Sequence, residues 1–347
     1  MNHVTASPHW ERLSSWHAAR RVYPKRREWK MRYKMFMRAT LHRSVYRALL
    51  MGVSLNPLLE RAVTHRANLL NKPFRPYISI RYGHIERLRH LLLHYQLQKS
   101  LLGDDVSARI TQRPGLWLGE CVVGGETASI HLGYRGAHDK EGEMMLMIIR
   151  PPRKRLYSAA LSFMRDDQGR PVLCLGTVQG SRQQSDWNRQ FTRDHFGLRP
   201  QSLMVELTQM LARALGMQGI HCVDNAHHVY RANPNGRRQR GFDLDALILE
   251  HGGEAKTSGW VVLPADQRRK TLETIVSKKR SMYRKRYAWL DALEGQVGQA
   301  LIGMPEPVSP EAAALAQTAR VPMTHAGHAP ASPMAGAQDG AVASAAL

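Results

Sequence analysis

The first 71 residues carry apolar side chains at helical spacing, with Lys and Arg between them. The repeating apolar positions in the clearest stretch are Trp29, Tyr33, Phe36 and Met37. This pattern predicts basic, amphipathic helices. Such helices either pack on a neighbouring domain with a solvated basic face or contact a polyanion or a membrane surface, and the pattern leaves both interpretations open.

The periodicity changes twice beyond a Pro-containing link at residues 72–76. Residues 84–102 place apolar side chains along one helical stripe, and the glycine that follows, Gly103, is expected to end this helix. From residue 115 onward the pattern consists of short apolar or alternating runs separated by turn residues. These runs predict five sequential strands in a mostly antiparallel meander, at residues 116–123, 128–134, 143–149, 156–164 and 172–178.

A helix and a further strand follow the meander. The predicted elements of this part are a helix at 202–215, a strand at 220–223, a short helix at 242–251, a short strand at 260–263 and a basic helix at 272–301. A strand, a helix and a strand after a meander indicate an α+β fold, with a mostly antiparallel mixed sheet and packed helices.

The composition divides the chain into three regions. Residues 1–71 form a basic helical arm, residues 72–302 form the α+β domain, and residues 303–347 are rich in Ala, Pro and Gly. The last region cannot bury enough apolar surface to offset the entropy lost on ordering, so we expect a disordered tail.

The net charge of +22 over 347 residues indicates a polyanionic partner. Residues 12–47 carry twelve Lys and Arg against one Glu, and residues 268–286 carry nine against one Glu, so these two segments hold +19 of the total. The candidate partners are lipid head groups, lipopolysaccharide and nucleic acid. Charge alone does not choose among them, and no helix-turn-helix or zinc-finger pattern supports the nucleic-acid interpretation.

The location is predicted from segments that the sequence lacks. No continuous apolar run in the first thirty residues indicates a secretory signal, and no segment supplies the roughly 20 apolar residues that a membrane span needs. The three cysteines each lie in a strand-like apolar run, which is not typical of a disulfide framework. We therefore expect a cytoplasmic protein, with peripheral contact at the inner membrane as an alternative.

Two glycine-containing segments are candidate anion sites. Gln179 and Gly180 stand where a strand ends, and glycine there lets backbone N–H groups approach a phosphate, although a plain turn is the simpler interpretation. Arg199 precedes Pro200 at a helix start, where unpaired N–H groups and the helix dipole favour an anion. Arg199 equally fits a pairing with a carboxylate.

A third candidate follows the strand at 220–223. His228 and Tyr230 are expected to share one face at a strand end, and Arg231 is placed to meet an anion. His221, Cys222 and His227 lie close by, but their spacing matches no zinc motif and adjacent strand residues point to opposite faces, so we predict no metal site.

Acidic residues are also candidates for proton transfer. The candidate general bases are Glu141, Glu143, Asp243 and Asp245, and nothing in the sequence brings them together. No nucleophile elbow and no zincin motif is present.

Short motifs spread over residues 81–287 occur together in a fixed order. They include Arg81-Tyr82, His94-Tyr95, Glu141-Gly142-Glu143, Leu156-Tyr157-Ser158, Gly176 to Gly180, Gly197 to Pro200, His228 to Arg231, Gly252-Gly253, Trp260 with Leu263-Pro264, and Lys279 to Tyr287. In these motifs the chain resembles the VirK/YbjX family, also called DUF535. Residues 243–248 lack the aromatic residues expected there, which weakens a stacking role for that segment.

The resemblance implies a role in virulence, envelope integrity or stress response in Gram-negative bacteria, without an agreed biochemical activity. Binding of an anionic ligand or partner through Gln179, Gly180, Arg199, His228, Tyr230 and Arg231 is the first hypothesis. The alternative is an acetyltransferase-like enzyme that uses coenzyme A or acyl-coenzyme A, because a meander, a glycine-containing strand end, a helix start and a further strand occur in the order such folds use. A nucleic-acid-binding protein is the second alternative, and the sequence does not decide whether the protein is an enzyme.

Overall fold

The computed structural model describes residues 8–134, 136–152, 154–181, 184–232, 243–266 and 269–302. Its helices are α1 (Pro8–Glu11), α2 (Ser15–Val22), η1 (Arg26–Glu28), α3 (Trp29–Leu41), α4 (Arg43–Leu55), α5 (Pro57–His65), η2 (Ala67–Phe74), α6 (His84–Thr111), η3 (Gly136–His138), α7 (Ser185–Asp194), α8 (Pro200–Ala214), η4 (Val229–Ala232), α9 (Leu244–Glu250), η5 (Leu272–Thr274) and α10 (Ser277–Ile302). The predicted tail at 303–347 lies outside the described residues.

One mixed sheet organises the α+β part. Its strands are β1 (Leu116–Val123), β2 (Glu126–Gly133), β3 (Met144–Arg150), β4 (Lys154–Arg165), β5 (Pro171–Gly180), β6 (Gly219–Val223), β7 (Glu254–Lys256) and β8 (Trp260–Pro264). They are ordered β1-β2-β3-β4-β5-β6-β8-β7, and each neighbouring pair is antiparallel except β5 and β6. The predicted α+β fold with a mostly antiparallel mixed sheet is confirmed.

The meander follows from the turn residues in the sequence. Gly124 and Gly125 join β1 to β2 with φ values of 60° and 82°, the left-handed conformation that a two-residue hairpin turn needs. Val123 pairs with Glu126 directly across this turn, and the same register sets Cys121 opposite Ala128, both of them buried.

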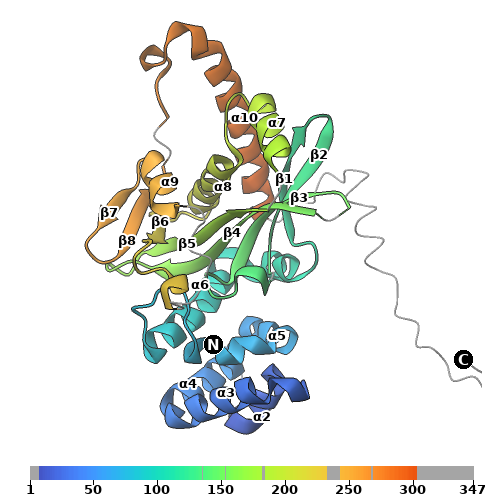
Figure 1. Cartoon of the computed structure of the whole chain (residues 1–347), viewed down its shortest axis with the longest axis vertical. Coiled ribbons are helices and arrows are strands. Elements are labelled where there is room, and N and C mark those ends of the chain that lie inside the picture. The colour runs from blue at the N-terminus through green and yellow to red at the C-terminus, as the bar shows by residue number, and fades with distance from the viewer. Residues whose placement is uncertain are drawn as a thin grey trace, which may run out of the picture. The chain divides into compact units, whose positions relative to one another are not determined.

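Helices cover both sides of the sheet. Figure 1 shows α7, α8 and α10 on one side, and α6 with the N-terminal helices on the other. Helix α8 connects the parallel strands β5 and β6 and packs on both of them. The N-terminal helices have their own apolar core, in which Leu49, Leu59 and Leu69 are fully buried and which meets Leu91 and Tyr95 of α6.

The structure refines the sequence prediction in three places. At Gly103 the backbone leaves the helical conformation, with φ of 67° and ψ of −176°, so the helix breaks there as predicted, and a second helical segment of α6, which was not predicted, continues to Thr111. Helix α7 and the short strand β7 were not predicted, since α7 is strongly polar and β7 is fully exposed. His228 and Tyr230 do not share a strand end, because His228 forms an isolated β-bridge with Ser79 and Tyr230 lies in the 3-10 helix η4.

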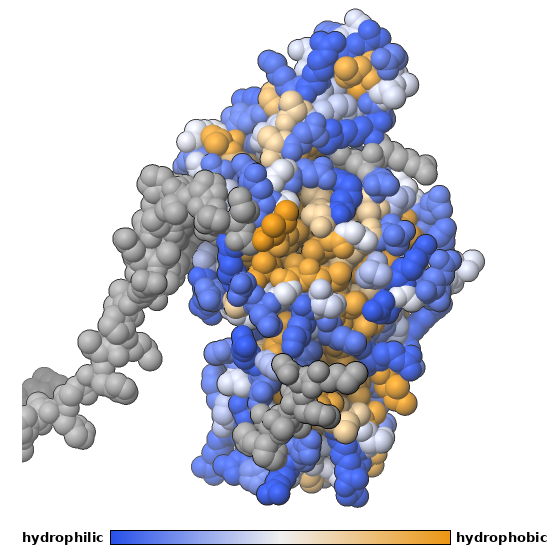
Figure 2. All heavy atoms as spheres, turned by 180° about the vertical axis from the view of Figure 1, so that it is seen from behind, coloured by the Kyte–Doolittle hydropathy of each residue, from blue (hydrophilic) through white to orange (hydrophobic). Residues whose placement is uncertain are grey.

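Some apolar side chains in the described part of the chain remain exposed to solvent. On the face shown in Figure 2 they gather in the middle, between mostly hydrophilic parts above and below. Among the described residues the largest exposed fractions of big apolar side chains belong to Ile302, Leu41 and Val276, at 81%, 73% and 71%. Large apolar side chains exposed together indicate contact with another surface.

Glu206 of α8 supplies a pH-dependent contribution to stability. Burial raises its pKa to about 7, although Arg269, Arg213 and Arg286 oppose the rise and Glu294 adds to it. Between about pH 4.5 and 7 the folded state therefore keeps a proton that the unfolded chain releases. The contribution of Glu206 to the stability of the folded state is largest below pH 4.5, and it is lost as the pH rises to about 7. We expect Glu206→Gln to raise the free energy of unfolding by about 1–3 kcal/mol at pH 8 and to change it little at pH 5. Denaturant unfolding at both pH values measures the difference, and an equal effect at the two values would contradict it.

Candidate functional site

The parallel strands β5 and β6 separate near the middle of the sheet. In the described ladder they pair from Leu173 with Ile220 to Leu175 with Cys222, after which β5 continues to Gly180 alongside β4 alone. The carboxyl ends of diverging parallel strands are where open α/β sheets bind ligands. This divergence makes the end of β5 the place to search for a site.

A bulge in β5 marks the point of divergence. Leu161 of β4 pairs with Leu175 and Ala160 pairs with Thr177, so Gly176 is left out of the β4–β5 register. A Cβ atom at Gly176 would lie 1.8 Å from the carbonyl oxygen of Glu141. Only glycine therefore allows the loop that carries Glu141 to lie against the bulge.

Glu141 is the centre of a buried polar group that we call the Glu141 cluster: Glu141, His138, Ser158, His228 and Tyr230. Its carboxylate is fully buried, and Oε2 accepts hydrogen bonds from the Tyr230 hydroxyl at 3.0 Å and from His138 Nδ1 at 2.8 Å. Oε1 has no hydrogen-bond partner among the described residues and lies 3.8 Å from His228 Nε2. A buried carboxylate oxygen without a donor is positioned to accept a proton or a hydrogen bond from a ligand.

Ser158, His138 and Glu141 are arranged like a Ser-His-acid triad, since His138 Nε2 lies 3.1 Å from Ser158 Oγ. Ser158 lies in the middle of β4, pairs with β3 on one side and β5 on the other, and is 2% exposed. A nucleophile needs free backbone donors for the oxyanion, and the strand pairing on both sides of Ser158 leaves none there. Ser158 therefore orients His138.

His228 joins the loop after β6 to the bulge. Its Nε2 donates to the Gly176 carbonyl oxygen at 2.8 Å, and its Nδ1 accepts from the Tyr230 backbone N–H at 3.4 Å. Both ring nitrogens thereby have hydrogen-bond partners, so His228 holds Tyr230 in place rather than acting as a free base.

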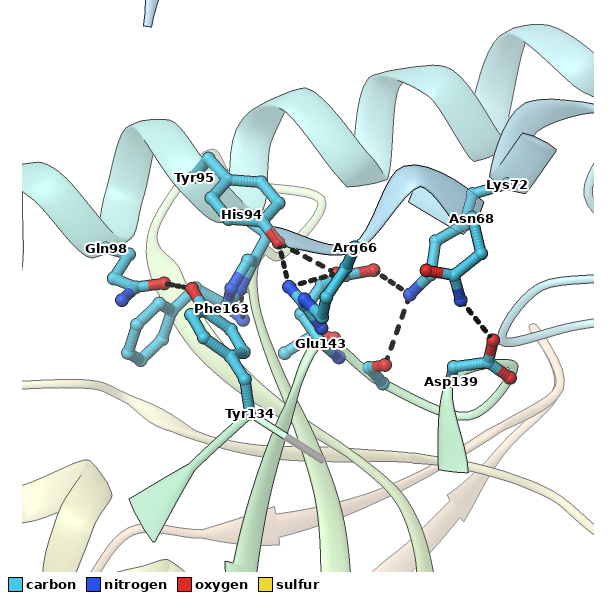
Figure 3. A network of polar contacts seen from close by, with 12 residues as sticks. Arg66, Asn68, Lys72, His94, Tyr95, Gln98, Tyr134, Asp139, Glu143 and Phe163 are labelled. Atoms are coloured by element: carbon cyan, nitrogen blue, oxygen red, sulfur yellow. Dashed lines mark hydrogen bonds and ion pairs between the residues drawn. The ribbon is translucent and has the colours of Figure 1, made fainter. Parts of the chain in front are cut away.

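A second buried network lies on the other side of the same loop, centred on Glu143 (Figure 3). Glu143 accepts from Lys72 and, at 3.2 Å, from the Tyr95 hydroxyl, and Arg66 Nη2 lies 3.9 Å away. Burial lowers the pKa of Lys72 to about 8, opposed by the carboxylate of Glu143, so the ammonium group is still protonated at pH 7. Burial alone would raise the pKa of Glu143, but Lys72 and Arg66 hold it below its ordinary value.

The N-terminal segment fixes the loop that joins the two networks. Lys72 Nζ donates to the Gly142 carbonyl oxygen at 3.3 Å, and Asp139 accepts from Asn68 at 2.8 Å and from Arg75 at 2.5 Å. The same loop is thus contacted by Asn68, which precedes the predicted boundary at residue 71, and by Lys72 and Arg75, which follow it. These bonds set the position of Glu141 at the bulge.

The sequence-predicted site residues fall into two groups. His228 and Tyr230 belong to the Glu141 cluster, and Gln179 lies on β5 three residues beyond the bulge, half-buried, with Nε2 3.4 Å from Thr177 Oγ1. Gly180 is exposed at the end of β5 against the ring of Tyr157.

The two predicted arginines make separate contacts. Arg199, the N-cap of α8, pairs with Glu250 of α9 and is 44% exposed. Arg231 is exposed and donates to the Asn225 carbonyl oxygen at 3.1 Å. The structure does not show either arginine in the Glu141 cluster.

His138 and Ser158 were not predicted as site residues, and Glu141 was predicted without a partner. The signal available for them was the occurrence of Glu141-Gly142-Glu143, Leu156-Tyr157-Ser158 and Gly176 among the ordered motifs. These motifs are far apart in sequence and meet only in the folded sheet.

The described ranges hold neither a metal cluster nor a membrane-spanning helix. No group of three or more His, Cys, Asp and Glu suitable for a metal ion occurs among those residues. The three cysteines are buried and free. No helix in the described part of the chain is long and apolar enough to cross a membrane.

The fold is thus a mixed, mostly antiparallel sheet with a buried polar cluster where β5 and β6 diverge. The family model described as "Protein of unknown function (DUF535)" matches residues 24–299, and the chain belongs to this family. It is 27% identical to the "Uncharacterized protein YbjX" of Escherichia coli over 247 residues, which cover 70% of this chain and 74% of that protein.

Two proteins of Haemophilus influenzae, each named "Uncharacterized protein", are also similar to the chain. One is 27% identical over 221 residues, covering 63% of this chain and 72% of the relative. The other is 34% identical over 156 residues, covering 44% of this chain and 50% of the relative. The predicted VirK/YbjX resemblance is confirmed at the level of the family.

Proposed function

We propose that the protein is an acyltransferase that binds a coenzyme A thioester at the divergence of β5 and β6 and transfers the acyl group to an amine. The observation that carries this proposal is the position of the Glu141 cluster directly at the bulge where the parallel pair ends. Acetyltransferase-like folds hold coenzyme A with the same order of strand, helix and parallel strand. The support from these folds is an analogy of fold. An acyl-coenzyme A is also an anionic ligand, in agreement with the basic chain.

The chemistry requires a base at the acceptor and an acid at the leaving group. The amine nitrogen attacks the thioester carbonyl carbon, the C–N bond forms and the C–S bond breaks. Glu141 is fully buried in the free protein, so binding of the substrates has to open the Glu141 cluster. Glu141 Oε1 then takes the proton of the amine, and the Tyr230 hydroxyl, 3.0 Å from Oε2, donates a proton to the thiolate and regains one from Glu141. The products are an amide and free coenzyme A.

The family resemblance gives this activity a cellular setting. Acylation of an amine removes its positive charge, which alters how a surface component binds cationic molecules. The proposal therefore includes the roles in envelope integrity, stress response and virulence that the resemblance implies. It places the enzyme in the cytoplasm, where coenzyme A thioesters are made.

Binding of the thioester is the first measurement. We expect acetyl-coenzyme A at a hundred times its Kd to raise the Tm by about 5 °C, because a ligand bound only to the folded state adds about 3 kcal/mol there. Isothermal titration with acetyl-coenzyme A, a long-chain acyl-coenzyme A and ADP separates recognition of the acyl chain from recognition of the nucleotide. No heat with any of these ligands together with an unchanged Tm would overturn the proposal.

A further inference from the structure

Helix α3 presents apolar and basic side chains on its outward face. Met35 and Ala39 are buried and mark the inward side of the helix. At 100° per residue the opposite side carries the row Trp29, Tyr33, Met37 and Leu41 together with Lys30 and Lys34. A surface helix usually places polar residues on that side, so this outward row is not explained by packing within the chain.

Three of the four side chains in the row are strongly exposed, and Met37 is half-buried. Trp29 is 59% exposed, Tyr33 is 53% exposed and Leu41 is 73% exposed. The row continues onto α2 through Phe36, whose ring centroid lies 6.4 Å from that of Tyr33 and 5.6 Å from that of Trp16. We call Trp16, Trp29, Tyr33, Phe36, Lys30 and Lys34 the α2–α3 surface.

We infer that the α2–α3 surface docks on a bilayer that contains anionic lipids. Trp and Tyr settle at the level of the head groups, because their rings are apolar with a polar edge. Arg26, Arg27, Lys30 and Lys34 are all exposed around the aromatic row, and each basic residue near an anionic bilayer adds about 1 kcal/mol of attraction. This inference does not depend on the proposed acyl transfer.

Two other occupants fit the surface less well. A nucleic acid could be bound by the lysines and the aromatic rings, but it offers nothing apolar to cover Leu41 at the end of the outward row, which is 73% exposed. A second copy of the chain would need roughly 1,000 Å² of buried area, whereas α3 has 13 residues and is about 20 Å long. The outward lysines would also face each other across such a dimer.

Co-sedimentation of the full chain with vesicles tests the docking. We expect binding to vesicles of phosphatidylcholine with 30% phosphatidylglycerol that weakens at high salt, and little binding to phosphatidylcholine alone. Trp29→Ser with Tyr33→Ser should weaken the binding roughly tenfold or more, and Lys30→Glu with Lys34→Glu should do the same. The matched controls are Leu249→Ser on α9 and Lys278→Glu with Lys279→Glu on α10, which change exposed side chains elsewhere.

The outcomes separate the alternatives, provided that far-ultraviolet circular dichroism and the Tm show each variant folded. Weaker vesicle binding in the α3 variants with unchanged controls supports the inference. Equal binding by α3 variants and controls overturns it. Loss of a dimer, or loss of binding to single-stranded DNA without any change on vesicles, overturns it as well, because either result assigns the surface to another partner.

Discussion

Replacement of Lys72 by Met is expected to lower the free energy of unfolding by about 3–5 kcal/mol, because it leaves the carboxylate of Glu143 buried without its main partner. Both side chains of this pair are fully buried. Tyr95 and Arg66 remain near Glu143, but the first is neutral and the second is 3.9 Å away. Denaturant unfolding at pH 7 measures the loss.

A second pair on the same loop provides the control. The ion pair between Arg75 and Asp139 has about a fifth of each side chain exposed, and Arg75→Met should cost about 1 kcal/mol or less because water solvates the remaining charge. Lys72→Met combined with Glu143→Leu should recover part of the loss, since no unpaired charge stays in the core. A single Lys72→Met variant as stable as the parent would show that this ion pair does not stabilise the folded state.

The architecture was predictable where the signals are local. Alternating apolar runs and glycine turns define β1 to β5, and Pro200 starts α8 at the first turn of the helix. The break at Gly103 was predictable from the glycine, but the helical segment that follows it was not, because its formation depends on the packing of Val106 and Ile110 in the core.

The candidate site was not predictable, because the topology creates it. Glu141 and Tyr230 are 89 residues apart and become neighbours only because α8 carries the chain from β5 to a parallel β6. Sequence reasoning expected His228 and Tyr230 on one face of a strand, whereas η4 turns Tyr230 toward Glu141. For Arg199 the sequence left two interpretations open, a bound anion and a carboxylate partner. The structure places the carboxylate of Glu250 beside it.

Glu141→Gln is expected to lower the rate of acyl transfer by about 10²- to 10⁴-fold, because the amide cannot take the proton of the attacking amine. Release of free thiol from acetyl-coenzyme A measures the rate with a lysine peptide, a polyamine or phosphatidylethanolamine as acceptor. The Kd for acetyl-coenzyme A should change little, since the Glu141 carboxylate is bonded to Tyr230 and His138 inside the cluster and is assigned to the amine rather than to the nucleotide. A rate loss with an unchanged Kd assigns the effect to the chemical step.

Two further variants separate a base from a merely structural carboxylate. Tyr230→Phe keeps the ring but removes the hydroxyl that donates to Oε2, and should lower the rate less than Glu141→Gln does. Glu126→Gln, at an exposed carboxylate on β2, should leave the rate unchanged. If Glu141→Gln retained the full rate while remaining folded, the proton would have to leave by another group and Glu141 would serve only to hold His138 and Tyr230. If instead the variant lost both rate and Tm, His138→Gln would distinguish the roles, since it disturbs the same hydrogen bonds and leaves the carboxylate in place.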